Sequence, residues 1–215
     1  MSDANRMILA SRSPRRRELL AFLMPPERIE VMPPASADEL DFNDVEGISA
    51  IKQRLEEIAQ GKNADVRGQL SAARRTDYAA VLSADTVIVS DDADGGPIVL
   101  GQPPEENWKA VVRDWFENLL LDRTHCALTA IVLSTPDDRV RKDVVETRVT
   151  FHDAASTQID WYLATGEPRG KAGGYAIQGA GSLFVESVQG SLSNVVGLPL
   201  EAVLARMQEL GVDDC

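Results

Sequence analysis

The strongest strand signal in the chain is the apolar stretch 79–90. An acidic turn with two glycines and a proline follows at 91–97 and leads back into the apolar residues 98–100, which predicts a β-hairpin. Helices are expected at 45–64, where apolar residues keep helical spacing, and at 104–120. A hairpin among interleaved strands and helices indicates an α/β fold with a mixed sheet rather than a purely parallel one.

The remaining segments alternate between the same two kinds of element. Strands are expected at 7–10, 28–32, 124–134 and 140–151, and helices from Pro14, from Ser156 to Ala164 and from near Pro199. Residues 33–44 form an acidic loop in this interpretation. The stretch 66–77 turns polar and carries three arginines, which predicts a surface insertion. Eight of the fifteen glycines lie between residues 166 and 197, which indicates turns and close backbone approaches there.

A chain of 215 residues is long enough for one domain with a substantial core, so residues 1–215 are expected to form a single domain. Two cysteines, Cys126 and Cys215, cannot build a disulfide framework and have no zinc-binding spacing, which favours a reducing compartment. The N-terminal residues lack the apolar segment of a signal peptide. We therefore expect a cytoplasmic protein.

Acidic residues outnumber basic residues by 34 to 22, and the net charge is −12. This charge argues against polymeric nucleic acid or an anionic membrane as a partner. The first twenty residues differ, because five arginines stand there against two acidic residues. A basic segment in an acidic protein needs a local explanation.

The basic segment follows the predicted strand 7–10, where Ser13 suits the N-cap of a helix and a proline follows it. Backbone N–H groups, two hydroxyls and two guanidinium groups would converge there on one anion, and a polyphosphate is the natural ligand. These candidate phosphate-binding residues are Ser11, Ser13, Arg15 and Arg16. The alternative is a solvated helix face with a capping serine. Cations beside a helix N-terminus oppose its dipole unless an anion is bound, which favours the binding site.

Asp85 interrupts the apolar strand 79–90 and is followed by Thr86. A carboxylate buried in such a strand costs several kcal/mol unless it is paired, hydrogen-bonded or bound to a metal. Asp85 is therefore a candidate base or metal ligand. In the alternative interpretation it ends one face of an edge strand and lies in water.

The glycine-rich segment 166–179 would let the backbone approach a ligand while Lys171 and Gln178 point at it. Glycine turns between strands are common, so this segment alone is weak evidence. No complete Walker A loop, dinucleotide motif or hydrolase elbow is present. His125 and Cys126 suggest a base and a nucleophile, but neighbours on a strand point to opposite faces and cannot share a proton.

Together, five ordered motifs resemble the Maf family of nucleotide pyrophosphatases, first named for septum formation, over nearly the whole chain. They are ILASxSPRRxELL at 8–20, SADTV at 83–87, LGxP at 100–103, KAGGYxIQG at 171–179 and NVVGLPL at 194–200. The resemblance implies an elongated α/β fold related to the inosine-triphosphate pyrophosphatases. In that fold a mixed sheet flanked by helices forms two lobes around a central cleft, and a homodimer is common.

The resemblance also implies hydrolysis of a nucleoside triphosphate to the monophosphate and pyrophosphate with a divalent cation, Mg²⁺ or Mn²⁺. Position by position, Asp85 matches the family's proton acceptor, Glu39 a carboxylate of the site and Lys62 a lysine of a helix pattern. Asp85 and Glu39 would hold the metal. Arg15, Thr86 and Gln178 match positions linked to substrate choice.

One motif departs from the family, because Gln102 stands where the family has a lysine near the phosphates. Loss of a charge-assisted hydrogen bond worth roughly 1.5–3 kcal/mol would weaken transition-state binding unless another cation compensates. Arg74 and Arg75, in the expected insertion, are candidates for that cation.

The segment 171–179 resembles the branch of the family that acts on dTTP and UTP. The amide of Gln178 can accept from N3–H of uracil or thymine and donate to O4, although a flipped amide also fits cytosine, so CTP and modified pyrimidine nucleotides stay open. Two alternatives also stay open. One is a non-catalytic nucleotide-binding regulator of cell division, and the other is a pyrophosphatase that selects 7-methyl-GTP or another purine nucleotide.

Overall fold

One mixed sheet runs through the length of the molecule, which a computed structural model describes for residues 6–36 and 40–212. Its strands are β1 (Met7–Ala10), β2 (Ile29–Val31), β3 (Ala80–Asp91), β4 (Pro97–Leu100), β5 (Thr124–Ser134), β6 (Val140–Phe151) and β7 (Val185–Gln189). The strand order is β2-β1-β3-β5-β6-β7, and β4 also pairs with β3. The pairs of β1 with β2 and with β3 are parallel, and the other pairs are antiparallel. The predicted mixed sheet is therefore confirmed.

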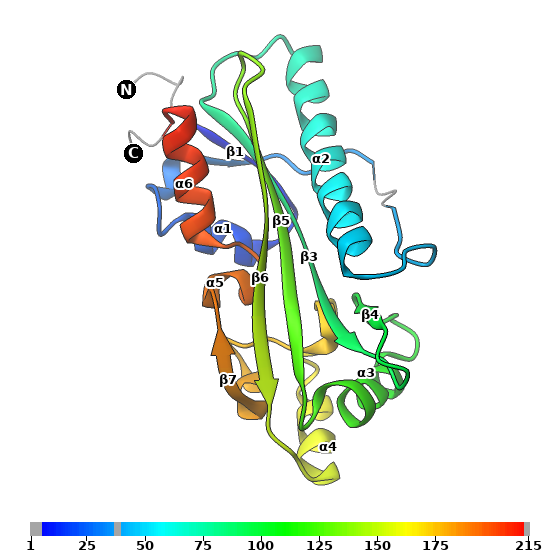
Figure 1. Cartoon of the computed structure of the whole chain (residues 1–215). Helices are drawn as coiled ribbons and strands as arrows, with labels where there is room; N and C mark the ends of the chain where they lie inside the picture. The colour runs from blue at the N-terminus through cyan, green and yellow to red at the C-terminus, as the bar shows by residue number, and fades with distance from the viewer. Residues whose placement is uncertain (1–5, 37–39, 213–215) are drawn as a thin grey trace.

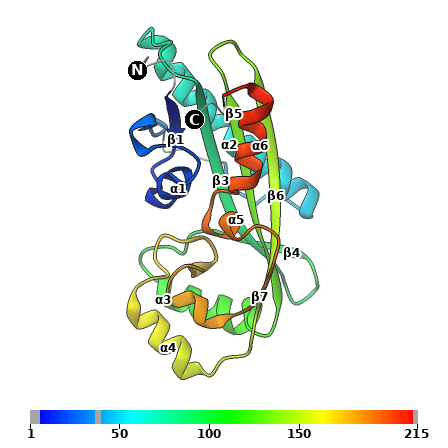
Figure 2. The same ribbon diagram turned by 90° about the vertical axis from the view of Figure 1, so that its left-hand side faces the viewer.

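Helices cover the sheet at both ends. They are α1 (Pro14–Leu20), α2 (Ile48–Ala72), α3 (Trp108–Trp115), α4 (Ser156–Thr165), α5 (Leu192–Val196) and α6 (Leu200–Leu210). In Figure 1, α2 lies along one side of the long strands β3, β5 and β6, and α1 and α6 lie on the other side. The turned view in Figure 2 shows α3, α4 and β7 gathered at the opposite end from β1 and α6. The elongated shape with two lobes agrees with the expectation from the sequence.

Strand β3 joins the two lobes, and its partners change along its length. Its first residues pair with β1, up to Ser83 opposite Ala10, and its last four residues pair with β4. Between these pairings, residues 84–87 have no partner strand on this edge within the described part of the chain. Because the pairing of β3 is interrupted here, side chains from both faces of this strand can reach the same place beside the edge.

Each lobe has its own apolar cluster against the shared sheet. In the lobe that holds the described ends of the chain, Leu9 and Leu82 of the sheet pack with Leu20 of α1 and Met207 of α6. In the other lobe the core is aromatic, and the ring centroids of Phe116 and Phe184 are 5.0 Å apart in an edge-to-face arrangement.

Most of the helices and strands predicted from the local sequence pattern are present at the predicted residues. The bounds 124–134 and 140–151 agree with β5 and β6, and the predicted hairpin is β3 with β4. Ser13 is the N-cap of α1, and its Oγ accepts a hydrogen bond from the Arg16 N–H at 3.4 Å. Helix α3 begins at Trp108 rather than at residue 104. The strand β7 and the short helix α5 lie in the glycine-dense tract, where no element was predicted.

The predicted surface insertion at 66–77 is wrong. Helix α2 continues to Ala72, and Val66 and Leu70 are fully buried against Ile8 and Val81 of the sheet. The stretch looks polar because only two of its first five residues face the core, while the others lie on the solvent side of the helix. In the described ranges, no helix combines the length and the apolar character needed to cross a membrane.

Candidate active site

A cavity of about 720 Å³ opens between the lobes, beside residues 84–87 of β3. All of the predicted site residues that the structure describes line it: Ser11, Ser13, Arg15, Arg16, Lys62, Asp85, Thr86, Lys171 and Gln178. Glu39, the remaining predicted site residue, lies outside the described residues. The structure thus brings the predicted residues to one place, while their individual roles stay predictions.

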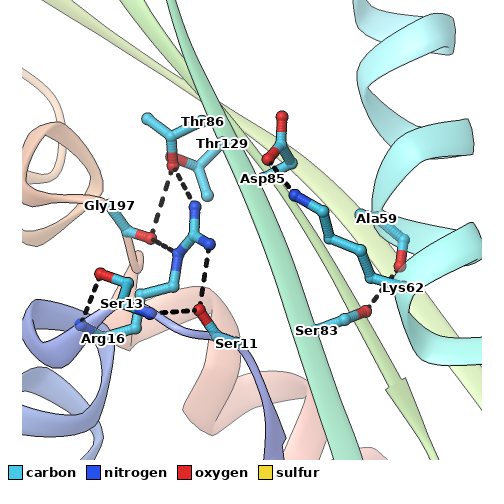
Figure 3. A network of polar contacts seen from close by, with 10 residues as sticks. All are labelled: Ser11, Ser13, Arg16, Ala59, Lys62, Ser83, Asp85, Thr86, Thr129 and Gly197. Carbon is cyan, nitrogen blue, oxygen red and sulfur yellow. Dashed lines mark hydrogen bonds and ion pairs between the residues drawn. The ribbon is translucent and has the colours of Figure 1, made fainter. Parts of the chain in front are cut away.

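The turn between β1 and α1 forms the wall of the cavity that carries most of the arginines. Ser11 Oγ accepts hydrogen bonds from the Ser13 N–H at 3.1 Å and from Arg16 Nη1 at 3.3 Å. Figure 3 shows the Arg16 guanidinium reaching across to two further segments, the Gly197 carbonyl at 2.9 Å from Nε and Thr86 Oγ1 at 3.1 Å from Nη2. Arg16 therefore joins α1, β3 and the end of α5, and its bonds to Ser11, Thr86 and Gly197 are to neutral oxygens.

The orientation of Thr86 depends on buried groups behind it. Its Oγ1 lies 3.0 Å from Thr129 Oγ1 on β5, and the Thr129 hydroxyl donates to the Asn194 carbonyl at 3.2 Å. Thr129 and Asn194 are fully buried. Because the Asn194 amide also donates to the Ala127 carbonyl at 3.0 Å, this network ties α5 to the sheet below the cavity.

Asp85 lies on the other side of β3 from Thr86 and pairs with Lys62 of α2 (Figure 3). The Lys62 Nζ atom is 2.6 Å from Asp85 Oδ1, and the two side chains are 14% and 16% exposed. Ser83 Oγ donates to the Ala59 carbonyl at 2.7 Å, which holds α2 against β3 one helical turn away. The expectation that a carboxylate in this strand needs a partner is confirmed, and the partner is Lys62.

Lys171 and Arg15 bring two positive charges together on the glycine-rich side of the cavity. The pKa of Lys171 lies below its usual value, first because burial penalises the ammonium form and second because Arg15 is near. Gly173 and Gly174 have φ angles of 66° and 68°, and a Cβ on either would lie 2.7 Å from a side-chain carbon of β3 or α3. Only glycine allows this close approach. The two adjacent cations, Lys171 and Arg15, favour an anionic ligand.

The cavity is positive although the protein is strongly acidic. Five cationic side chains and three carboxylates are among its described lining residues. Asp65 accepts hydrogen bonds from the backbone N–H groups of Ala35 and Ser36, which lower its pKa together with Gln69. Glu57 lies 3.5 Å from the guanidinium of Arg54. Asp85 is the third carboxylate, and it pairs with Lys62.

Tyr175 also lines the cavity, and its hydroxyl lies 2.9 Å from Nε2 of His125. Burial lowers the pKa of His125 to about 3, so the imidazole is neutral at physiological pH. Its ring packs edge-to-face on Phe151, whereas Cys126 faces Glu146 on the other side of the sheet. The rejection of His125 and Cys126 as a catalytic pair is therefore confirmed.

The sequence model of the family described as "Maf-like protein" matches residues 6–210. The chain belongs to the Maf family. The match begins one residue before β1 and ends at the last residue of α6, so it contains every described helix and strand.

Proteins named dTTP/UTP pyrophosphatase are similar to this Maf chain over almost their whole length. The protein from Brucella abortus is 37% identical over 212 residues, which cover 98% of this chain and 94% of that one. The protein from Myxococcus xanthus is 37% identical over 213 residues, with 98% and 95% covered. The match to a solved structure of a nucleoside-triphosphatase/dITP/XTP pyrophosphatase from Mycobacterium abscessus covers 95% of both chains at 15% identity, with a TM-score of 0.44.

In this Maf structure the donor set suits a metal that is shared with a phosphate ligand. Mg²⁺ usually keeps waters and binds one or two carboxylates together with substrate phosphates. Within residues 6–36 and 40–212, no cluster of three or more His, Cys, Asp or Glu side chains could hold a metal by itself. Asp85 supplies one carboxylate to the lining of the positive cavity. One carboxylate fits a metal ion that is also bound by substrate phosphates, and does not fit a metal ion bound by protein ligands alone.

Two parts of the Maf site differ from the sequence-based interpretation. Neither Arg74 nor Arg75 is among the described residues that line the cavity, and the Arg75 guanidinium binds Glu30 and Asp77, so neither replaces the lysine expected at Gln102. Arg12 was not selected, yet it lines the cavity and donates to the Pro34 carbonyl at 3.1 Å. Its position between the two serines of the turn is the signal that could have identified it.

Proposed function

We propose that this Maf protein hydrolyses dTTP and UTP to the nucleoside monophosphate and pyrophosphate. The observation that carries the proposal is the cavity itself, where a cationic turn, a carboxylate paired with a lysine and the amide of Gln178 line one space. The names of the relatives support the same activity, since they are dTTP/UTP pyrophosphatases at 37% identity. A house-cleaning role in nucleotide pools follows from that activity.

The cationic residues of the cavity would bind the triphosphate. Arg15 and Lys171 lie close enough for Arg15 to lower the pKa of the lysine, and a phosphate between them would remove that repulsion. The turn Ser11–Arg16 adds Ser13, whose N–H donates to Ser11 Oγ and whose own Oγ caps the Arg16 N–H, so Ser13 holds the turn in shape beside the ligand. Arg16 would contribute charge while its bonds to Thr86 and Gly197 keep the wall rigid.

In the proposed reaction, the oxygen of a water molecule forms a bond to the α-phosphorus and the bond from that phosphorus to the bridging oxygen breaks. Pyrophosphate leaves, and Asp85 accepts the proton of the water. Lys62 holds Asp85 Oδ1 at 2.6 Å and thereby orients the carboxylate. Asp85 and Glu39 are the proposed ligands of a divalent cation, Mg²⁺ or Mn²⁺, which would neutralise developing negative charge on the phosphates.

Gln178 would recognise the base. Its amide carbonyl can accept from N3–H and its amide nitrogen can donate to O4, a pattern that uracil and thymine share. The methyl group that separates them is worth only about 1 kcal/mol when it is buried. We therefore expect activity on both dTTP and UTP, with weaker discrimination against CTP and modified pyrimidine nucleotides than against purines.

The test is product identification with dTTP, UTP and a panel of purine nucleotides in the presence of Mg²⁺ or Mn²⁺. We expect the monophosphate and pyrophosphate from the pyrimidine nucleotides, and loss of turnover in Asp85→Asn. Release of orthophosphate and a diphosphate would contradict the proposal. Tight dTTP binding without turnover would favour a regulatory nucleotide-binding protein, and a preference for 7-methyl-GTP or another purine would favour the other branch.

We further propose that residues 1–215 act as one domain of two lobes and that the protein is a homodimer in the cytoplasm. One sheet that continues through both lobes supports the single domain. The family resemblance alone supports the dimer. Light scattering at several protein concentrations would test it, and a mass of 23.4 kDa at all of them would contradict it.

A further inference from the structure

The carboxylate of Glu167 binds the backbone of the segment that carries Gln178. Its Oε2 accepts a hydrogen bond from the Ala180 N–H at 2.8 Å, and its Oε1 accepts one from the Gly181 N–H at 2.9 Å. These are the first two residues of the short helical turn Ala180–Phe184, which follows directly on the bend that holds Gln178. Because the charged carboxylate accepts hydrogen bonds from two consecutive N–H groups, it fixes the position of the backbone directly after the bend.

Tyr162 holds the other end of the same bend. Its hydroxyl lies 3.1 Å from Glu167 Oε1 and 3.3 Å from the carbonyl of Gly174, which precedes the bend. Burial raises the pKa of Tyr162, and the negative charge of Glu167 raises it further, so the hydroxyl keeps its proton and donates. Glu167 and Tyr162 thus connect the residues before Gln178 with the residues after it.

The space around the carboxylate is closed by a glycine next to Gln178. A Cβ on Gly179 would lie 2.1 Å from Glu167 Oε2. The bend and the carboxylate therefore fit together only with glycine at 179. The backbone oxygen of Glu167 also accepts a hydrogen bond from Lys171 Nζ, so the same residue contacts a lysine of the cavity wall.

We propose that Glu167 is a positioning residue that holds the bend of Gln178 and thereby sets the base selectivity of the site. This inference rests on the proposed function, because it needs Gln178 to read the base. Glu167 itself contacts no nucleotide in this proposal, since it is absent from the cavity lining. Its carboxylate acts through the backbone of Ala180 and Gly181.

The experiment compares the wild-type protein with Glu167→Gln on dTTP, UTP and GTP. A glutamine offers one oxygen and one NH₂ group where two N–H donors need acceptors, so the bend loses one bond and faces a donor. We expect KM for dTTP and UTP to rise about tenfold with kcat within about twofold, because base contacts contribute binding in both the ground state and the transition state. The ratio of kcat/KM for UTP over GTP should fall by about tenfold, since only a nucleotide that is read by Gln178 loses affinity.

Two further variants test the same contact in other ways. Tyr162→Phe removes one hydroxyl and should change KM and the UTP over GTP ratio in the same direction, by a smaller factor. Gly179→Ala should displace the carboxylate, and its effect should not add to that of Glu167→Gln, because residues in one hydrogen-bonded unit are not independent. Glu186→Gln, a substitution of an exposed glutamate on β7, is the matched control and should leave both quantities unchanged.

The outcomes separate the inference from the proposed function. A wild-type protein that hydrolyses neither dTTP nor UTP would contradict the proposed function, and the inference would fall with it. A wild-type protein with that activity whose Glu167→Gln variant keeps its KM and its UTP over GTP ratio would overturn the role of Glu167 alone. A variant that loses kcat equally for all nucleotides would also overturn it, because that is the effect of a smaller folded fraction. If Glu167→Gln does not fold, Tyr162→Phe decides by the same two readouts.

Discussion

Lys62 and Asp85 form a pair of opposite charges that is largely withdrawn from water, with both side chains less than one-fifth exposed. Within the described ranges, Lys62 is the hydrogen-bond partner of the Asp85 side chain. An ion pair of this kind orients a carboxylate more strictly than water does, because the ammonium group fixes the direction of one oxygen. The orientation of Asp85 should therefore depend on Lys62.

The first prediction concerns Lys62→Met, which keeps the length of the side chain and removes its charge. We expect kcat for dTTP to fall by about 10- to 100-fold, which corresponds to the roughly 1.5–3 kcal/mol of a charge-assisted hydrogen bond. Lys142→Met, at an exposed ion pair with Glu56, is the control and should retain activity. Equal kcat values for Lys62→Met and the wild type would show that the pair has no role in turnover.

The second prediction concerns the pH dependence of stability. The pKa of His125 is about 3 in the folded protein because the ring is buried, against about 6.5 in an unfolded chain. Between these values the unfolded state binds more protons, so the free energy of unfolding falls as pH falls below 6.5. From pH 7 to pH 5 this residue should remove about 2 kcal/mol of stability.

Urea unfolding at pH 7 and pH 5 checks this, with His125→Gln as the comparison. The variant lacks the titrating group, so its free energy of unfolding should fall about 2 kcal/mol less than that of the wild type between the two pH values. The half-buried His152, whose pKa is raised by backbone carbonyls, has the opposite effect but is present in both proteins. Equal pH dependence of the two proteins would contradict a neutral buried His125.

At the scale of elements, helix α2 shows how a core helix can look like a loop in sequence. Eleven of its 25 residues carry charged or amide side chains, and the buried residues are Ile51, Leu55, Ile58, Ala59, Asn63, Val66 and Leu70. Spacing of three or four residues continues from Asn63 through Val66 to Leu70, so the signal was present. Arg67, Arg74 and Arg75 obscure it, because they make the composition of the stretch 66–77 polar.

The third prediction follows from this placement of α2. Leu70→Ala should lower the free energy of unfolding by about 3 kcal/mol, because Leu70 is fully buried and large-to-small substitutions of this kind cost about 2–5 kcal/mol. Ser71→Ala, at an exposed neighbouring position, should stay within about 0.5 kcal/mol of the wild type. Chemical denaturation of the three proteins measures both values. A small effect of Leu70→Ala would support a surface insertion instead.

Strand β3 explains why the site lies where it does. Asp85 and Thr86 are successive residues and point to opposite faces of the sheet, toward α2 and toward α1. Both line the same cavity because, within residues 6–36 and 40–212, no strand pairs with this edge of β3 at 84–87, between the ends of β1 and β4. A change of partner strand therefore allows one short motif to contribute a carboxylate and a hydroxyl from two faces.

Over the whole molecule, the charge of the cavity differs in sign from the net charge of the chain. The net charge of −12 argues against a polymeric anion as ligand, while the cavity gathers five cations against three carboxylates. A small polyphosphate fits this division, because it experiences the local cations at short range while the acidic surface is screened over about 10 Å.

The fourth prediction tests whether the two lobes unfold together. All three tryptophans, Trp108, Trp115 and Trp161, lie on α3 and α4 in one lobe, whereas circular dichroism reports on helices in both. Because β3, β5 and β6 run through both lobes, we expect the fluorescence and circular dichroism transitions in urea to coincide. Two separate midpoints would show two independently folding units.

The sequence by itself determined the fold class, the hairpin of β3 and β4, the N-cap at Ser13 and nine of the residues that line the cavity, of which Lys62 was selected only through the family resemblance. These features depend on periodicity, capping and motif chemistry, which act over a few residues. Only the tertiary structure decided that Lys62 is the partner of Asp85, 23 residues away, and that Arg16 binds the Gly197 carbonyl, 181 residues away. Such contacts depend on how α2 and α5 pack against the shared sheet, and packing is a property of the whole chain that no local pattern contains.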